Sequence, residues 1–97
     1  MSGYVLSPRA QADLDEIWNY TKRNWGMDQA ETYIRLIGAA IQTAASSPKR
    51  GKTCDHIREG YRKYPAGSHM IFFRVIKGGI NVVRILHRRM DFDRHLD

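Results

Sequence analysis

The side chains that could do chemistry gather in the second half of the 97-residue chain. RNA cleavage by its own 2′-hydroxyl needs a proton acceptor, a proton donor and cations that stabilise charge on phosphorus. Arg74 and Arg84 would form the cationic clamp, while His87, Tyr61 or Tyr64 would act as acid or base. The alternative is that these arginines form the solvated face of a half-buried sheet. The full cationic and imidazole set is Arg62, Lys63, Arg74, Arg84, His87, Arg88 and Arg89.

Other chemical signatures are missing from the sequence. It has no glycine-rich phosphate loop, HExxH pair, CxxC pair or nucleophile elbow. His69, His87 and His95 match no recurrent metal spacing. Cys54 is the single cysteine, so it has no partner for a disulfide or a thiolate zinc site. We expect no metal and no cofactor.

The formal net charge of +6 is unevenly distributed. Residues 1–48 carry four Lys and Arg against five Asp and Glu, whereas residues 49–97 carry twelve against five and all four histidines. A basic surface of this kind meets nucleic acid or docks an acidic protein partner. A third interpretation is that the charge serves solubility alone.

Length and composition indicate a single domain over residues 1–97. The apolar fraction of 42% and charged fraction of 27% are those of a globular protein. No apolar run approaches the roughly 20 residues of a membrane span, and the N-terminus lacks a signal pattern. A lone cysteine fits a reducing compartment. We expect a cytoplasmic protein that does not contact a membrane.

The first half predicts a strand and two helices. A short strand at 4–6 leads into Ser7-Pro8, a cap and first-turn pair, and helical periodicity continues to Trp25. Trp18 and Trp25 lie seven residues apart, which predicts core positions for both. Asp28 with Glu31 resembles a capping box for a second helix that reaches Ser46. The short connection favours an antiparallel hairpin.

The second half predicts strands. After a basic loop at 49–53, segments at about 57–64, 68–76 and 80–87 are joined by turn residues and form an antiparallel meander. Both faces of the middle strand are apolar, and the helical hairpin covers one face, which leaves the other as a basic, partly apolar surface. Residues 88–97 form a tail that lies on the domain or projects from it. The fold class is α+β, with a short N-terminal strand, a helical hairpin on a three-stranded antiparallel meander, and a C-terminal tail.

This order of elements resembles a known family. The first matching stretch is Leu6-Ser7-Pro8 with Ala12, Asp13, Leu14, Ile17, Trp18 and Tyr20. The later one runs from Gly60-Tyr61-Arg62 through Gly67-Ser68-His69 to the segment 83–91, VRILHRRMD. Over about residues 4–96 the chain resembles the ParE toxins of the RelE/ParE superfamily.

The resemblance implies a toxin of a type II toxin-antitoxin system that acts in plasmid or chromosome stability. Such toxins inhibit DNA gyrase, trap it on cleaved DNA and so block replication, without catalysis of their own. A ParD-like antitoxin neutralises them and alone contacts operator DNA. The alternative is a ribosome-dependent ribonuclease of the RelE type, with Arg74, Arg84 and His87 catalytic, although the tail lacks the terminal tyrosine of several such enzymes. A third possibility is a purely regulatory binding module.

The charge and the apolar pattern of the chain suggest two sets of contact residues. An amphipathic antitoxin helix would lie in a groove of apolar helix-face residues with an arginine-rich rim. Expected antitoxin contacts are Trp18, Tyr33, Ile34, Ile37, Arg58, Arg62 and Arg74. Expected contacts to the target, needed for toxicity, are Arg88, Arg89, Met90, Asp91, Phe92 and Arg94.

Overall fold

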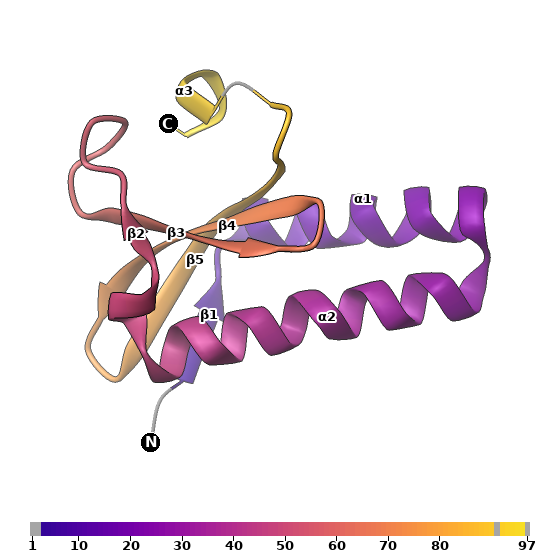
Figure 1. Cartoon of the computed structure of the whole chain (residues 1–97), viewed down its shortest axis with the longest axis horizontal. Helices are drawn as coiled ribbons and strands as arrows, with labels where there is room; N and C mark the ends of the chain where they lie inside the picture. The colour runs from indigo at the N-terminus through magenta and orange to yellow at the C-terminus, as the bar shows by residue number, and fades with distance from the viewer. Residues whose placement is uncertain (1–2, 91, 97) are drawn as a thin grey trace.

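The computed structural model describes residues 3–90 and 92–96 and has an α+β architecture (Figure 1). The predicted order, a strand, then a helical hairpin, then β-strands, is confirmed. The elements are β1 (Gly3–Leu6), α1 (Pro8–Trp25), α2 (Met27–Ser46), the 3-10 turn η1 (Pro48–Arg50), β2 (Lys52–Thr53), β3 (Tyr61–Ala66), β4 (His69–Ile76), β5 (Gly79–His87) and α3 (Phe92–His95).

The sheet has five strands in the order β1-β5-β4-β3-β2. β3, β4 and β5 are the expected antiparallel meander. The three-stranded description is nevertheless incomplete, because β1 pairs in parallel with β5 and β2 pairs antiparallel with β3. β2 falls in the segment expected to be a basic loop, and two residues are too few to produce an alternating pattern. The sheet is therefore mixed.

β3 begins four residues later than predicted. The backbone N–H groups of Ile57 and Arg58 donate to the carbonyl of Cys54, and that of Tyr61 donates to the carbonyl of Arg58. These bonds fold residues 54–60 into turns, and Gly60 has a φ of +84°. The apolar character of Ile57 reflects packing of a turn against the sheet and not strand pairing.

The helical hairpin is set by its caps. The hydroxyl of Ser7 accepts the N–H of Ala10, as predicted for the start of α1. Gly26, with a φ of +93°, ends α1 and is itself the N-cap residue of α2, so one residue joins the helices. The predicted capping box at Asp28 is wrong, because α2 already begins at Met27 and Asp28 lies inside its first turn.

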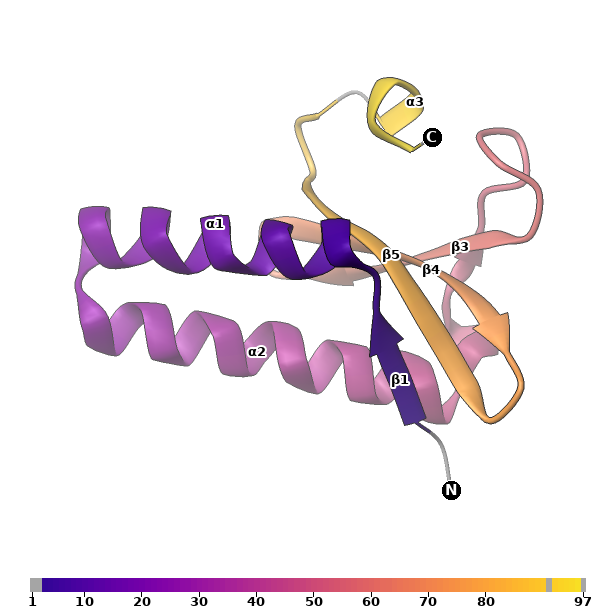
Figure 2. The same cartoon turned by 180° about the vertical axis from the view of Figure 1, so that it is seen from behind.

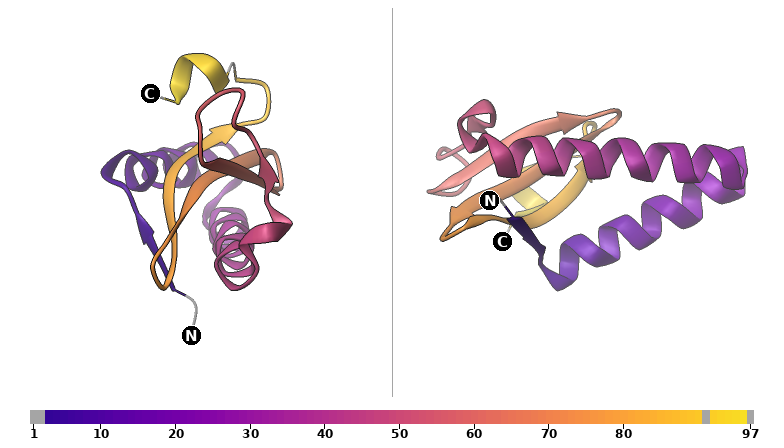
Figure 3. Two further views of the ribbon diagram at one scale, coloured as in Figure 1. Left: turned by 90° about the vertical axis from the view of Figure 1, so that its left-hand side faces the viewer. Right: turned by 90° about the horizontal axis from the view of Figure 1, so that it is seen from below.

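Apolar side chains pack on both faces of the sheet. On one face α1 and α2 cover a cluster that includes Ile37, Ile71 and Phe73. On the other face Phe72, Leu86 and Cys54 form a second cluster with Leu96 of the C-terminal segment. Figures 2 and 3 show α3 on the side of the sheet away from the helical hairpin. The face expected to be open is thus partly covered by the tail, which lies on the domain.

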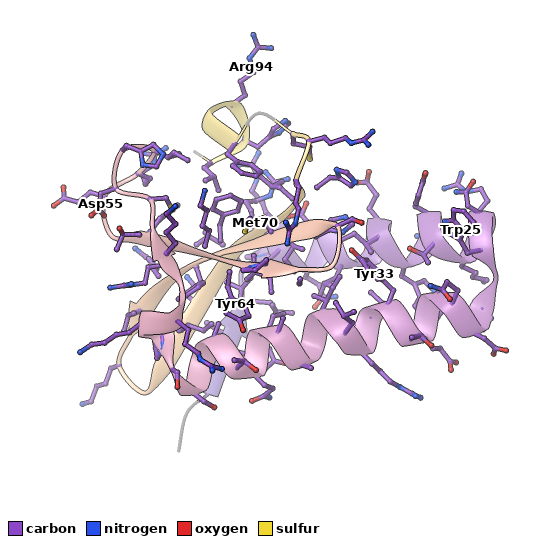
Figure 4. The ribbon with its side chains drawn as sticks, viewed as in Figure 1. Trp25, Tyr33, Asp55, Tyr64, Met70 and Arg94 are labelled. Atoms are coloured by element: carbon purple, nitrogen blue, oxygen red, sulfur yellow. The ribbon has the colours of Figure 1, made fainter. Side chains whose placement is uncertain are left out.

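The predicted core position of Trp25 is wrong. Its side chain is 71% exposed, whereas Trp18 is half-buried. Figure 4 shows Trp25 at the tip of the hairpin, where the helices extend past the sheet. Helical spacing fixes which side of a helix a residue occupies but not whether the core reaches that far along it. Among residues 3–90 and 92–96, no helix combines the length and apolar character of a membrane span.

Candidate functional site

Side chains from the start of α1 complete one edge of β5. β1 pairs with residues 79–82 of that strand, and beyond them the hydroxyl of Ser7 donates to the carbonyl of Val83 at 2.9 Å. The carboxylate of Asp13 accepts the backbone N–H of Ile85, also at 2.9 Å. A cap residue and a helical carboxylate therefore extend the pairing that β1 begins.

Arg84 is the second partner of that carboxylate. Its Nε and Nη2 donate to the two oxygens of Asp13 at 2.8 and 2.9 Å, a bidentate pair. The two side chains are only 16% and 12% exposed. The hydrogen bond to Asp13 raises the pKa of Arg84, so the guanidinium stays charged. Its Nη1 donates to the carbonyl of His95 at 3.0 Å. Arg84 is thus engaged by protein acceptors on both sides of the sheet edge.

Three ring side chains meet where β4 begins and β5 ends. The hydroxyl of Tyr33 lies 2.6 Å from Nδ1 of His69 and accepts the backbone N–H of Ser68 at 2.9 Å. The His69 ring packs edge-on against His87, with centroids 5.3 Å apart. Burial, and then the nearby charge of His87, lower the pKa of His69 to about 4. His69 is therefore neutral at physiological pH.

These groups line a cleft of about 590 Å³ between α1, the start of α2, and the adjoining ends of β4 and β5. Its wall is mainly apolar and aromatic, with the Asp13–Arg84 pair at one side. The lining residues include Ile17, Tyr20, Trp25, Tyr33, His69, Leu86, His87 and Met90. A smaller hollow beside it is lined by Ser68, His87, Arg88 and Arg89, so the rim of the cleft is cationic. An apolar cleft with a basic rim suits an amphipathic acidic segment.

The residues proposed for RNA cleavage come together only in part: Arg84 and His87 both line the cleft, whereas Arg74 does not. Arg74 pairs with Asn81, and His87 lies six residues further along β5, about 20 Å away at the rise of a strand. Arg74 is the cross-strand neighbour of Tyr61, on the face that α3 covers, whereas His87 lines the cleft under the helices. Arg84 is held by Asp13 and His95, and the remaining acid or base candidate, Tyr64, packs against the helix-side cluster.

The expected target contacts divide into two groups. Arg88, Arg89 and Met90 follow β5 and are exposed. Phe92 packs on Phe72 at a centroid separation of 4.7 Å. Arg94 is exposed and extends away from the domain in Figure 4. Asp91 lies outside the described residues.

The expected antitoxin contacts lie in several places. Tyr33 lines the cleft, and Trp18 and Ile34 are half-buried on the hairpin. Ile37 has no exposed surface, so direct contact with a partner does not fit its place in the core. The arginines of this set lie on different elements: Arg58, in the turns before β3, donates to the carbonyl of Leu96, Arg62 on β3 donates to that of Gly51, and Arg74 on β4 is exposed.

Sequence reasoning missed the roles of Asp13 and His69. Asp13 shares the buried stripe of α1 with Ala10 and Ile17. A carboxylate on an apolar stripe was the available signal, since a buried charge needs a partner. His69 offered no comparable signal, because its burial depends on Tyr33 from a distant helix. Among residues 3–90 and 92–96, no cluster of three metal-ligating side chains is present.

Comparisons with known proteins agree on one family. A family model described as "ParE toxin of type II toxin-antitoxin system, parDE" matches residues 4–92. "Toxin ParE1" of Mycobacterium tuberculosis (strain CDC 1551 / Oshkosh) is 57% identical over 96 residues, 98% of each chain. "Toxin ParE1" of Caulobacter vibrioides is 42% identical over 96 residues, 99% of each chain.

A solved structure has the same fold. The chain described as "Chromosomal ParDE TA system from P. aeruginosa" aligns with a TM-score of 0.77 at 21% identity, covering 90% of this chain and 96% of that one. The motifs at both ends of the sequence, the matching family model and the two relatives lead to the same conclusion. The chain belongs to the ParE toxin family of type II toxin-antitoxin systems.

Proposed function

We propose that this toxin inhibits DNA gyrase in the cytoplasm and so blocks replication, and that a ParD-like antitoxin neutralises it by direct binding. Operator DNA is contacted only through the antitoxin. The toxin acts by binding and not by catalysis, since Arg74 lies away from His87 along the sheet and Arg84 is held by Asp13 and His95. Family membership supports the toxin role, and the surfaces of the chain support how it binds.

The observation that carries the target assignment is the exposed cationic turn after β5. Arg88, Arg89 and Met90 are exposed, and Phe92 and Leu96 anchor the next turn of chain on the sheet. Two arginines on an anchored turn present a defined positive surface to a partner that holds DNA. Arg94, on α3, is a further exposed arginine of the tail.

The antitoxin assignment rests on the cleft. An amphipathic helix would place apolar side chains against Tyr20 and Trp25, both exposed, and acidic side chains near Arg88 and Arg89. Tyr33 also lines the cleft. Trp18 and Ile34 extend the apolar surface along the hairpin, and a longer antitoxin segment would reach Arg58, Arg62 and Arg74.

Gyrase supercoiling and DNA-cleavage assays with the purified chain test the target. Removal of the tail is a poor test, because Leu96 is 3% exposed and its loss would uncover the second cluster. The better variant is Arg88→Gln with Arg89→Gln, which we expect to lower inhibition at least tenfold. The matched control is Arg9→Gln with Arg35→Gln, which removes two exposed charges from the helices.

Two outcomes would contradict the proposal. One is a purified chain that neither inhibits supercoiling nor accumulates cleaved DNA. The other is an equal loss of inhibition in both double variants, since that would show a dependence on net charge and not on the turn after β5. His87→Gln should keep full toxicity, because the proposed mechanism uses no acid or base.

A further inference from the structure

We infer that Arg84 is a positioning residue that fixes α3, and with it the exposed residues 88–90, relative to α1. This inference rests on the proposed role of the tail in target binding. Arg84 itself is largely buried and would not touch the target. It would act through the carbonyl of His95 on one side and the carboxylate of Asp13 on the other.

The carbonyl groups at the end of α3 are where Arg84 acts. The last carbonyls of a helix have no partner within the helix and need other donors. Nη1 of Arg84 donates to the carbonyl of His95 at 3.0 Å, and Nη2 of Arg58 donates to that of Leu96 at 2.9 Å. A single helical turn is too short to be stable alone, so these two hydrogen bonds help to stabilise α3.

The apolar contacts of α3 fix its distance from the sheet. Phe92 meets Phe72 edge-on, Nζ of Lys63 lies 5.8 Å from the Phe92 ring centre, and Leu96 is buried in the second cluster. Such contacts hold the segment against the sheet, but apolar burial is non-directional. The hydrogen bond from Arg84 supplies direction, which apolar burial lacks.

Asp13 fixes the orientation of the Arg84 side chain. Because Nε and Nη2 are both bonded to the carboxylate, the planar guanidinium has one orientation, and Nη1 then points at His95. Arg84 also lies opposite Phe72 in the sheet register, so its backbone starts beneath α3. One side chain thus connects α1, β5 and α3.

Arg84→Lys tests the inference. Lysine keeps a positive charge for Asp13 but lacks the planar fork that reaches both acceptors. The N–H of Leu96 is bonded to the carbonyl of Phe92, so its hydrogen exchange reports on α3. We expect exchange in residues 92–96 to become at least tenfold faster while amides of β4 change less than twofold, and gyrase inhibition to fall at least fivefold. Arg35→Lys, on the exposed side of α2, is the control and should change none of these.

The readouts separate failure of this inference from failure of the proposed function. Unchanged exchange at 92–96 in a folded Arg84→Lys variant overturns the positioning role, whatever gyrase does. Faster exchange with full gyrase inhibition overturns its link to toxicity. Should Arg84→Lys lose protection in β4 as well, the double variant Asp13→Asn with Arg84→Gln removes both charges and leaves neither one unpaired. The same exchange and inhibition results are then required of it.

Discussion

The hydroxyl of Tyr33, on α2, lies 2.6 Å from Nδ1 of His69, on β4, and the same hydroxyl accepts the N–H of Ser68. One phenol thus pins the turn between β3 and β4 to the helical hairpin. The contact also buries an imidazole against a second one, His87, on the adjacent strand. Because the ring is buried there, protonation of His69 is unfavourable in the folded state.

A loss of stability at mildly acidic pH follows from His69. Its pKa is lowered from 6.5 to about 4 on folding, so between these values the unfolded chain binds a proton that the folded chain does not. Above pH 6.5 the titration of His69 does not affect the free energy of unfolding. As the pH falls towards 4, it lowers the free energy of unfolding by roughly 1 to 3 kcal/mol. Urea unfolding at pH 7.0 and 4.5 measures it.

His69→Gln is the control for that measurement, because glutamine can still accept a hydrogen bond from Tyr33 without titrating. The variant should lose less stability than the parent between the two pH values. An identical loss in both proteins would assign the pH dependence to other groups.

Gly79 and Gly38 should respond oppositely to alanine. A Cβ at Gly79 would overlap the carbonyl of Gly3 in the paired β1, whereas one at Gly38 has nothing within 4 Å. Gly79→Ala should therefore displace β1 and cost about 1 to 3 kcal/mol. Gly38→Ala, in the middle of α2, should stabilise the fold by about 0.5 to 1 kcal/mol. Thermal unfolding of the two variants gives the comparison, and destabilisation of similar size in both would contradict it.

Asp13→Asn should be far more damaging than Asp15→Asn. Asparagine offers one acceptor oxygen and no charge, so Arg84 would remain poorly paired at 16% exposure, at a cost of about 2 to 4 kcal/mol. Asp15 makes an exposed contact with Gln11, and its replacement should cost under about 0.5 kcal/mol. Urea unfolding at pH 7 measures both. Equal costs would mean that the Asp13–Arg84 pair adds little to the fold.

Features that depend on neighbouring residues, such as helix caps and turns, were predictable from the sequence. Ser7 and Pro8 begin α1 as expected because a cap and a fixed φ act within one turn. The meander followed from turn residues such as Gly67, whose φ of +60° favours glycine. Whether the tail docks is not predictable from local sequence, because it depends on contacts of Phe92 with Phe72 and of Leu96 with the second cluster.

The candidate site was less predictable, because it depends on contacts between distant segments. Asp13 and Arg84 are 71 residues apart, and neither position alone indicates a bidentate pair. Periodicity placed Trp25 on the core side of α1, but the extent of the sheet along the hairpin decides that it is exposed. The residues of a surface are thus set by where the core ends, which a one-dimensional pattern does not record.

Trp25 offers a direct test of the antitoxin cleft. Its side chain is 71% exposed, so Trp25→Ala should change the free energy of unfolding by less than about 0.5 kcal/mol. Aromatic anchors dominate the binding energy of interfaces, so the affinity for a ParD-like antitoxin should fall at least tenfold. Calorimetric titration with the antitoxin measures it.

Leu36→Ala is the matched control for Trp25→Ala. Leu36 is a large apolar residue, 43% exposed, on α2, and it is not among the residues that line the cleft. Its replacement should leave the affinity for the antitoxin within about twofold, because surface residues outside an interface core contribute little. If instead Leu36→Ala weakens binding as much as Trp25→Ala does, the antitoxin binds along the outer surface of the hairpin. Tyr33 and His69 would then serve the fold alone.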